Sequence, residues 1–322
     1  MLTRFQRKLA GLVGRRLGYG VLTLLASSML VFAATQVLPG NAANAILGQT
    51  ATPQRVRVVE QQLHLNRSVP AQYWAWLSGL LSGHPGHSYV NGVSVWSLVG
   101  PRIINTVALL GLAALVGVLL GLGAGLISAV RRDGLLDNTL SAVALAVAAV
   151  PEYVVAMVLV IVFAVNLSHL LPATFVLASG ARPWDNPKGL VLPVATLALV
   201  ISPYVFRMTR SSLIEALESD YVETARLMGI RDRTIVTRHA LPNALAPTIQ
   251  VIGLQLLYLA GGVVVVEYVF NYPGIGQALV SAVSDRDLPT LQLIVVLLAT
   301  FYVLVNIVTD VLTLIVTPRL SR

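Results

Sequence analysis

The chain has 322 residues, of which 56% are hydrophobic and 11% are charged, and its mean hydropathy is +0.78. A soluble domain ordinarily has about a quarter of its residues charged, so this composition excludes that class and indicates a protein of the lipid bilayer. The net charge of +8 is explained without a nucleic-acid partner, because arginines beside membrane spans face anionic lipid. The absence of cysteine excludes disulfides and thiol catalysis.

Charge-free hydrophobic runs predict the membrane spans. They cover residues 17–38, 103–130, 138–150, 153–167, 189–206, 240–266 and 288–309. Because about 20 apolar residues cross the hydrocarbon core, the third and fourth runs are predicted to join across Pro151 and Glu152 into one helix. The expected fold is therefore all-α, with six transmembrane helices.

The distribution of basic residues predicts the orientation. With a cytoplasmic N-terminus, 15 of the 22 basic residues fall on inside segments. We therefore expect a multi-pass protein with cytoplasmic tails at residues 1–16 and 318–322. The first span, 17–38, is predicted to stay as an uncleaved anchor, since its apolar run is longer than that of a signal peptide.

An extracytoplasmic segment, residues 39–99, follows the first span. Prolines near the first turn predict two short helices in it, at 53–65 and 70–81. The second has an amphipathic stripe with Tyr73 and Trp74, which favours a cap on the outer membrane surface over a ligand pocket. Residues 100–317 then form a core with the remaining five spans.

A charged segment, residues 207–241, separates the fourth and fifth spans. Its pattern predicts a helix, a corner and a further helix. Asp220 is expected to be the N-cap of a short helix that ends at Gly229, and Pro242 opens the fifth span. Such a segment, held at both ends by membrane spans, needs a functional reason.

Common catalytic and energy-coupling motifs are absent from the sequence. Neither Lys8 nor Lys188 lies in a phosphate-binding Gly-Lys-Ser/Thr loop, and there is no Gly-x-Ser-x-Gly or His-Glu-x-x-His. His84 and His87 lack a third metal ligand nearby in the sequence. We therefore expect neither an enzyme nor a metal site, and no ATP binding through a P-loop.

The charged segment carries a recognisable motif, Glu223-Thr224-Ala225-x-x-x-Gly229, with His239-x-Leu241-Pro242 following after nine residues. This motif resembles the "EAA" loop of bacterial ATP-binding-cassette (ABC) importer permeases. Thr224 and His239 depart from the commonest residues of that loop, while His-Ala-Leu-Pro-Asn is typical of the dipeptide and oligopeptide branch.

Motifs along nearly the whole chain resemble the B-type permease subunits of that branch. They include Val37-Leu38-Pro39-Gly40, Ser88-Tyr89, Asn105-Thr106, the run from Glu267 to Gly276, Arg286-Asp287-Leu288-Pro289, and the stretch from Tyr302 to Asp310. Asn41, residues 84–87 and Thr317 depart from the family pattern.

The resemblance implies the type I ABC importer fold, in the bacterial plasma (inner) membrane. It implies a heterodimer with a second permease, two cytoplasmic ATPase subunits that bind ATP and Mg, and an extracytoplasmic substrate-binding protein. This chain itself would need no cofactor. The implied activity is peptide import, with a nickel chelate, haem or glutathione as alternative cargo.

The resemblance makes the charged segment a coupling helix that docks on the ATPase. The residues assigned to this coupling are Glu223, Thr224, Ala225, Arg226, Gly229, His239, Leu241 and Pro242. For Glu223 alone, stabilisation of the helix dipole in the first turn is an equal alternative.

Polar residues within the spans are candidates for the translocation pathway. Glu152 is costly in lipid, so it should face protein or water, and it lies beside a possible kink at Pro151. Tyr204, Gln255 and Tyr258 are further candidates, for which helix packing is the competing interpretation. Pro193 and Pro203 are predicted to lie within a span.

Two other groups complete the candidate residues. The family places the segment with Glu267, Tyr272, Pro273, Gly274 and Gly276 near the outer gate or the receptor contact. Asn306 and Asp310 share one helix face, so they are expected to contact another span. A self-sufficient channel or ion-coupled carrier stays open as an alternative function, although acids within the spans are few.

Overall fold

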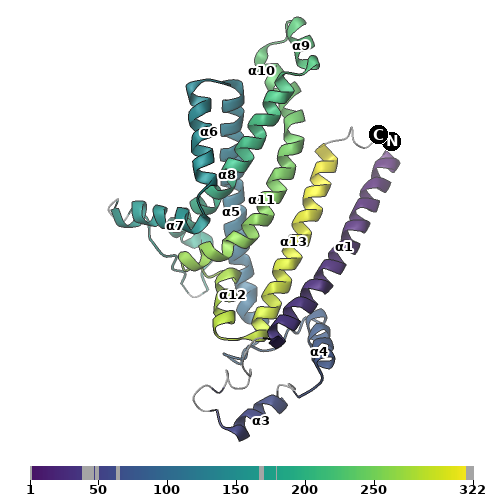
Figure 1. The fold of residues 1–322 in the computed structure, drawn as a ribbon, viewed down its shortest axis with the longest axis vertical. Coiled ribbons are helices and arrows are strands. Elements are labelled where there is room, and N and C mark those ends of the chain that lie inside the picture. Colours follow the sequence, from purple (N-terminus) through teal and green to yellow (C-terminus); the bar gives the residue numbers. More distant parts are fainter. Residues whose placement is uncertain are drawn as a thin grey trace. The chain divides into compact units, whose positions relative to one another are not determined.

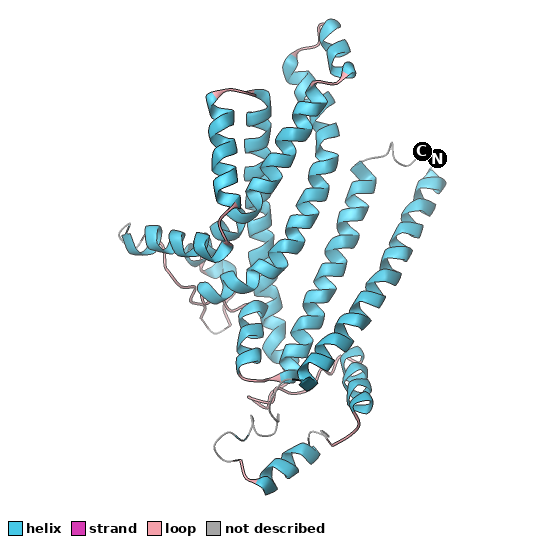
Figure 2. Cartoon of the chain, viewed as in Figure 1, coloured by secondary structure: helices cyan, strands magenta, loops and turns pink. Residues whose placement is uncertain are grey.

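The computed structural model describes residues 2–37, 47, 51–62, 66–166, 170–178 and 180–316. These residues are almost entirely helical or in loops (Figure 2), and their only β pairing is an isolated bridge between His87 and Ser94. The predicted all-α class is confirmed. The predicted tail at 318–322, Asn41 and Thr317 lie outside the described residues.

Helices of very different length make up the chain (Figure 1). The long ones are α1 (Leu2–Val37), α5 (Val95–Val130), α8 (Pro187–Leu217), α11 (Leu241–Val269) and α13 (Leu288–Val316). The shorter ones are α3 (Pro53–Gln62), α4 (Val69–Leu81), α6 (Leu135–Ala148), α7 (Glu152–Val160), α9 (Asp220–Leu227), α10 (Asp232–Thr234) and α12 (Ile275–Ser284). Two π-helical segments, η2 (Ile161–Asn166) and η4 (Ile235–Ala240), and a 3₁₀ turn, η3 (Pro183–Asp185), complete the described elements.

The predicted third span is broken. The helices on either side of residues 149–151 are bent by 105°, so the prediction of one continuous helix across Pro151 and Glu152 is wrong. Pro151 has extended backbone (ψ 145°), and a proline also disfavours helical backbone at the residue before it. Within the part of the chain that the structure describes, five helices are long and apolar enough to cross a membrane, and six spans result if the bent pair counts as one.

Prolines act differently in α8. Pro193 and Pro203 lie inside this helix, as predicted, and both are buried. α8 continues through both positions to Leu217, because neighbouring helices can compensate for a lost backbone hydrogen bond.

The chain divides into two compact units. The first contains Met1–Arg16, Val107–Tyr272 and Leu304–Arg322, and the second contains Leu17–Thr106 and Pro273–Val303. In the first unit α8 packs against α6, α7 and α11, and α7 also packs against α11. Figure 1 shows α7 running across the direction of α6 and α8.

A stripe of glycines lets α5 approach α8 closely. Gly117, Gly121 and Gly125 recur every four residues, and a Cβ atom built on each would lie 2.8 Å from a backbone carbonyl oxygen of α8. The opposing carbonyls belong to Ala198, Ser202 and Phe206, also four residues apart. This is the small-residue packing of membrane helices; the sequence analysis missed it, although the spacing of the glycines is its signal.

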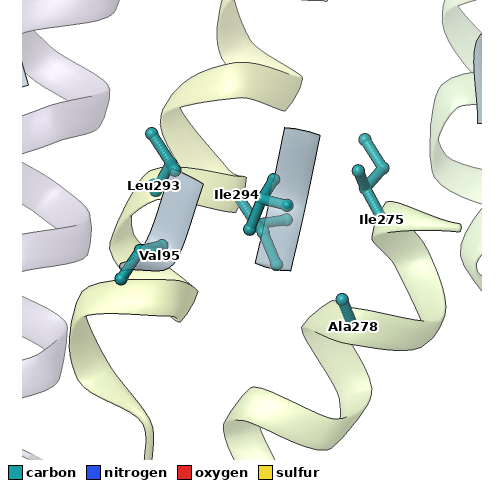
Figure 3. Packing of buried hydrophobic residues seen from close by; sticks show 6 residues of the cluster. Val95, Ile275, Ala278, Leu293 and Ile294 are labelled. Atoms are coloured by element: carbon teal, nitrogen blue, oxygen red, sulfur yellow. The ribbon is translucent and has the colours of Figure 1, made fainter. Parts of the chain in front are cut away.

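The second unit has its own apolar core. Val95 and Val99 of α5, Ile275 and Ala278 of α12, and Leu293 and Ile294 of α13 form one buried cluster. Figure 3 shows these three helices contributing side chains to the same point. The cluster packs α12 and the start of α13 against the first turns of α5.

The close approach of α11 and α13 in the first unit gives a testable prediction. A Cβ atom on Gly253 would lie 2.2 Å from Cγ2 and 2.4 Å from Oγ1 of Thr309. We expect Gly253→Ala to reduce stability by about 1–3 kcal/mol, through overpacking. Adding Thr309→Ala should restore part of the loss, because it removes the two nearest atoms. Thermal unfolding of the purified protein in detergent measures both effects, and an unchanged midpoint for Gly253→Ala would contradict this packing.

Candidate functional site

The charged segment forms the tip of the first unit. Figure 1 shows α9 and α10 beyond the ends of α8 and α11, to which they connect. α9 begins at Asp220, and its N-cap is Ser219, so the prediction of Asp220 as N-cap is wrong by one residue. Asp220 and Glu223 lie in the first turn and Arg226 in the last, which is the favourable arrangement for the helix dipole.

Gly229 ends α9 in a Schellman motif. Its φ is +76°, its N–H donates to the carbonyl of Arg226 (2.9 Å), and the N–H of Ile230 donates to the carbonyl of Ala225 (3.1 Å). A Cβ atom on Gly229 would meet nothing within 4 Å. The glycine is therefore required by its left-handed backbone, and not by close approach of another chain segment.

One face of α9 packs inward. Val222 and Ala225 form a buried cluster with Ile235 of η4, against which Leu217 and Ile230 also pack. Ala225 is only 4% exposed, so its contribution to the segment is to hold α9 in place.

The other face of α9 is open to solvent. Glu223, Thr224 and Arg226 are exposed there, as are two apolar side chains that the sequence analysis missed, Leu227 (83% exposed) and Met228 (69%). The predicted motif gave no reason to single out these two residues, because they lie at its variable positions. Together these five side chains form a mixed charged and apolar surface suited to a protein partner.

The return path from α9 runs through the π-helix η4 into α11. His239 is exposed in η4, and its carbonyl accepts a hydrogen bond from Nδ2 of Asn243 (2.9 Å). The same Nδ2 donates to the hydroxyl of Tyr221 on α9 (3.1 Å). Leu241 and Pro242 form the first turn of α11, as predicted.

The predicted pathway residues gather along α7, α8 and α11. The phenol of Tyr258 interacts electrostatically with the side chains of Glu152 and Tyr204. A Cβ atom on Gly262, one turn further along α11, would lie 3.6 Å from Oε1 of Glu152. The side chain of Tyr258 is 54% exposed in this chain.

A cavity of about 650 Å³ lies beside these residues. Its lining includes Ser141 of α6, Tyr204, Arg207 and Arg210 of α8, and Leu254 and Gln255 of α11. Oε1 of Gln255 is buried and accepts no hydrogen bond from the described residues. The cavity thus offers a polar ligand the buried acceptor of Gln255 and the basic group of Arg207, whereas Arg210 is already paired with Asp137.

The candidate outer-gate residues fall in two groups, of which Glu267 and Tyr272 belong to the first unit. Both side chains are buried, and the N–H of Tyr272 donates to the carbonyl of Glu267 (2.8 Å). The ring of Tyr272 lies 4.7 Å from that of Phe175, centroid to centroid. Burial, with the nearby Glu267, raises the pKa of the Tyr272 phenol above its ordinary value, so the phenol is neutral at physiological pH.

Pro273, Gly274 and Gly276 belong to the second unit, where the start of α5 holds this loop. The carbonyl of Pro273 accepts from Nδ2 of Asn105 (2.8 Å) and the N–H of Ile275 donates to Oγ1 of Thr106 (2.8 Å). The Asn-Thr and Pro-Gly-Ile-Gly motifs, far apart in sequence, therefore form one site.

Asp310 contacts another helix, as expected. Its carboxylate is paired with Arg16 of α1. Asn306 lies one turn earlier on α13. The described residues hold no group of three or more histidines and acids that could bind a metal ion.

A second charged cluster, which the sequence analysis missed, lies where α5 and α6 meet α8. Asp137 is buried and is paired with Arg210 through two hydrogen bonds, of 2.6 and 2.7 Å. The sequence alone could not choose the partner of Asp137 among 22 basic residues.

Comparison with known families gives two adjoining matches. The family described as "Binding-protein-dependent transport system inner membrane component" matches residues 117–322. Its N-terminal companion, "Binding-prot-dependent transport system membrane comp, N-term", matches residues 9–110.

Curated relatives are similar over almost their whole length. The probable peptide ABC transporter permease protein y4tP of Sinorhizobium fredii is 34% identical over 307 residues, covering 95% of this chain and 97% of the relative. The glutathione transport system permease protein GsiC is 34% identical in Pectobacterium atrosepticum, covering 99% of both chains. In Escherichia coli K12 the identity to GsiC is 35%, covering 92% of this chain and 94% of the relative.

Among solved structures, the inward-facing MetNI methionine ABC transporter contains a chain similar to this one. The TM-score is 0.55 at 20% sequence identity, with 69% of this chain and 97% of that chain covered. At this identity the likeness concerns the fold alone.

Proposed function

Because the chain belongs to the family of binding-protein-dependent transport system inner membrane components, we propose that it forms half of the translocation pathway of an ATP-driven peptide importer. Its fold is that of the type I ABC importer permeases. The observation that carries the proposal is the geometry of the charged segment, in which α9 projects beyond α8 and α11 and exposes Glu223, Arg226, Leu227 and Met228. A partner that binds this face can move two long apolar helices at once.

The proposed orientation places α9 and both termini in the cytoplasm. The supporting observation is the excess of basic residues on the segments that this orientation puts inside, 15 of 22. The loop at residues 273–277 and helices α3 and α4 are then extracytoplasmic, and the loop can contact a substrate-binding protein.

The proposed assembly contains a similar, non-identical permease, two ATPase subunits and an extracytoplasmic substrate-binding protein. The ATPases supply bound ATP and Mg, and this chain supplies the docking surface and the path. The cavity beside Tyr204, Arg207 and Gln255 supports the path, since it offers polar groups next to α8 and α11. Peptides carry the carboxylate and amide groups that such residues bind.

The proposed cargo is a peptide, and the relatives narrow its chemistry. One is named a peptide permease and others are named glutathione permeases, and glutathione is itself a short peptide. A glutathione-like compound is therefore the first alternative cargo, ahead of a nickel chelate or haem.

Reconstitution tests the proposal. Proteoliposomes with the chain, a second permease, the ATPases and the binding protein should accumulate labelled di- and tripeptides only when ATP is present. Vesicles with this chain alone should show no peptide flux. ATP-independent flux from the chain alone would overturn the proposal in favour of a self-sufficient channel or carrier.

A further inference from the structure

The cluster around Asp137 joins three elements of the first unit. Asp137 lies in the first turn of α6, and its side chain is 1% exposed. Its Oδ1 accepts from Nε of Arg210 on α8 (2.6 Å) and from the hydroxyl of Ser128 on α5. Its Oδ2 accepts from Nη2 of Arg210 (2.7 Å) and from the N–H of Asp133 in the α5–α6 turn (2.9 Å). Both carboxylate oxygens therefore have two donors each, which is their usual capacity.

The two hydrogen bonds between Asp137 and Arg210 give the contact a fixed geometry. A planar guanidinium that meets a carboxylate with two parallel bonds restricts both distance and direction. Because the carboxylate is buried, separation from Arg210 would leave an unpaired negative charge inside the protein, so the pair resists separation. The α5–α6 turn is thereby held against one point of α8.

That point is close to the charged segment. From Arg210, α8 continues without a break to Leu217, about 10 Å of helix, and α9 starts at Asp220. The glycine stripe brings α5 against α8 as far as Gly125 and Thr209, immediately before Arg210. On its other side α9 joins α11 through the π-helix η4, a conformation that is rare and often found at functional sites.

We propose that Asp137 and Arg210 are positioning residues for energy coupling. They fasten the α5–α6 turn to α8, so that α5, α6 and α8 move as one body when a partner moves α9. The inference rests on the proposed function, because it takes the moving partner to be the ATPase. The inference adds that a displacement of α9 moves α5, α6 and α8 together, and not α8 alone.

An exposed pair nearby provides the matched control. Arg132 of the same turn is paired with Glu218, which follows α8, and both side chains are largely open to solvent. Exposed ion pairs contribute little, since water screens them. We therefore expect Glu218→Gln to leave peptide uptake near the wild-type level.

The first experiment compares variants of the buried pair in the reconstituted importer. Asp137→Asn should lower peptide transported per ATP hydrolysed by about tenfold or more, while the complex still assembles and basal ATP hydrolysis persists. Arg210→Lys keeps the charge but loses the two parallel hydrogen bonds, so its transport per ATP should lie below the wild-type level and above that of Arg210→Gln. Wild-type transport per ATP in Asp137→Asn would overturn the proposal.

A second measurement keeps Asp137 and Arg210 unchanged. It therefore tests whether α6 and α8 move together even if Asp137→Asn fails to fold. The sequence has no cysteine, which allows spin labels at Thr139→Cys on α6 and Glu215→Cys on α8 without further changes. In the assembled importer the distance between the labels should be the same with and without bound ATP. A distance that changes with ATP in a transport-active complex would show that α6 and α8 move separately, and would overturn the proposal.

The same experiment separates this inference from the proposed function. If the ATPases do not bind the labelled chain at all, the assignment of α9 as their docking site fails. If they bind and peptide is transported, but the label distance changes, only the role of Asp137 and Arg210 fails.

Discussion

Peptide uptake should fall to the background of cells that lack the permease when Glu223→Ala and Gly229→Pro are combined. Proline fixes φ near −65°, whereas Gly229 has φ +76°, so the end of α9 cannot keep its course. Proline also lacks the N–H that donates to Arg226, and the Schellman motif is lost. Glu223→Ala removes an exposed carboxylate from the docking face. Uptake of a labelled peptide, with the permease quantified in membrane fractions, measures the effect.

Membrane insertion should survive in this double variant, because both residues lie outside the long apolar helices. A graded series at Gly229 alone separates backbone strain from other causes. Asn tolerates left-handed backbone, whereas Ala costs about 1–2 kcal/mol there, so uptake should decrease in the order Gly, Asn, Ala, Pro. Full uptake by the double variant would remove the coupling role from the charged segment.

Local signals in the sequence were sufficient for much of this architecture. Charge-free runs placed the long helices, and the glycine at position 229 marked the end of α9, since both depend on the chemistry of neighbouring residues. The break at Pro151 was misjudged because span length was given more weight than the backbone restriction that a proline imposes. Length alone cannot distinguish a crossing helix from two shorter helices at a sharp angle.

The candidate sites also differ in how far the sequence alone predicts them. The motif from Glu223 to Pro242 is contiguous, so the sequence contained it, while the exposed pair Leu227 and Met228 became visible only with the orientation of α9. The partnership of Asp137 with Arg210 spans 73 positions and depends on tertiary packing. No local pattern specifies which arginine such an acid meets.

A substitution at the close contact between α5 and α8 should cause a large loss of stability. A Cβ atom on Gly121 would lie 2.7 Å from Cβ of Val205 and 2.8 Å from the carbonyl oxygen of Ser202. Side chains can rotate away from a new neighbour, but a carbonyl in a helix cannot without moving the helix. Gly121→Leu should therefore destabilise the protein by about 3 kcal/mol, at the upper end of overpacking effects.

Gly123 on the same helix is the matched control. A Cβ atom there would meet nothing within 4 Å, so Gly123→Leu should be neutral or slightly stabilising, because leucine forms helix better than glycine. Thermal unfolding in detergent compares the two variants, and equal midpoints would contradict close packing of α5 on α8. A measurement of peptide transported per ATP distinguishes a role in coupling from a role in stability alone. If α5 moves with α8 during transport, the Gly121→Leu protein that remains folded should transport less peptide per ATP than the wild type. Loss of stability with unchanged transport per ATP would mean that the glycine stripe holds the fold together but does not take part in coupling.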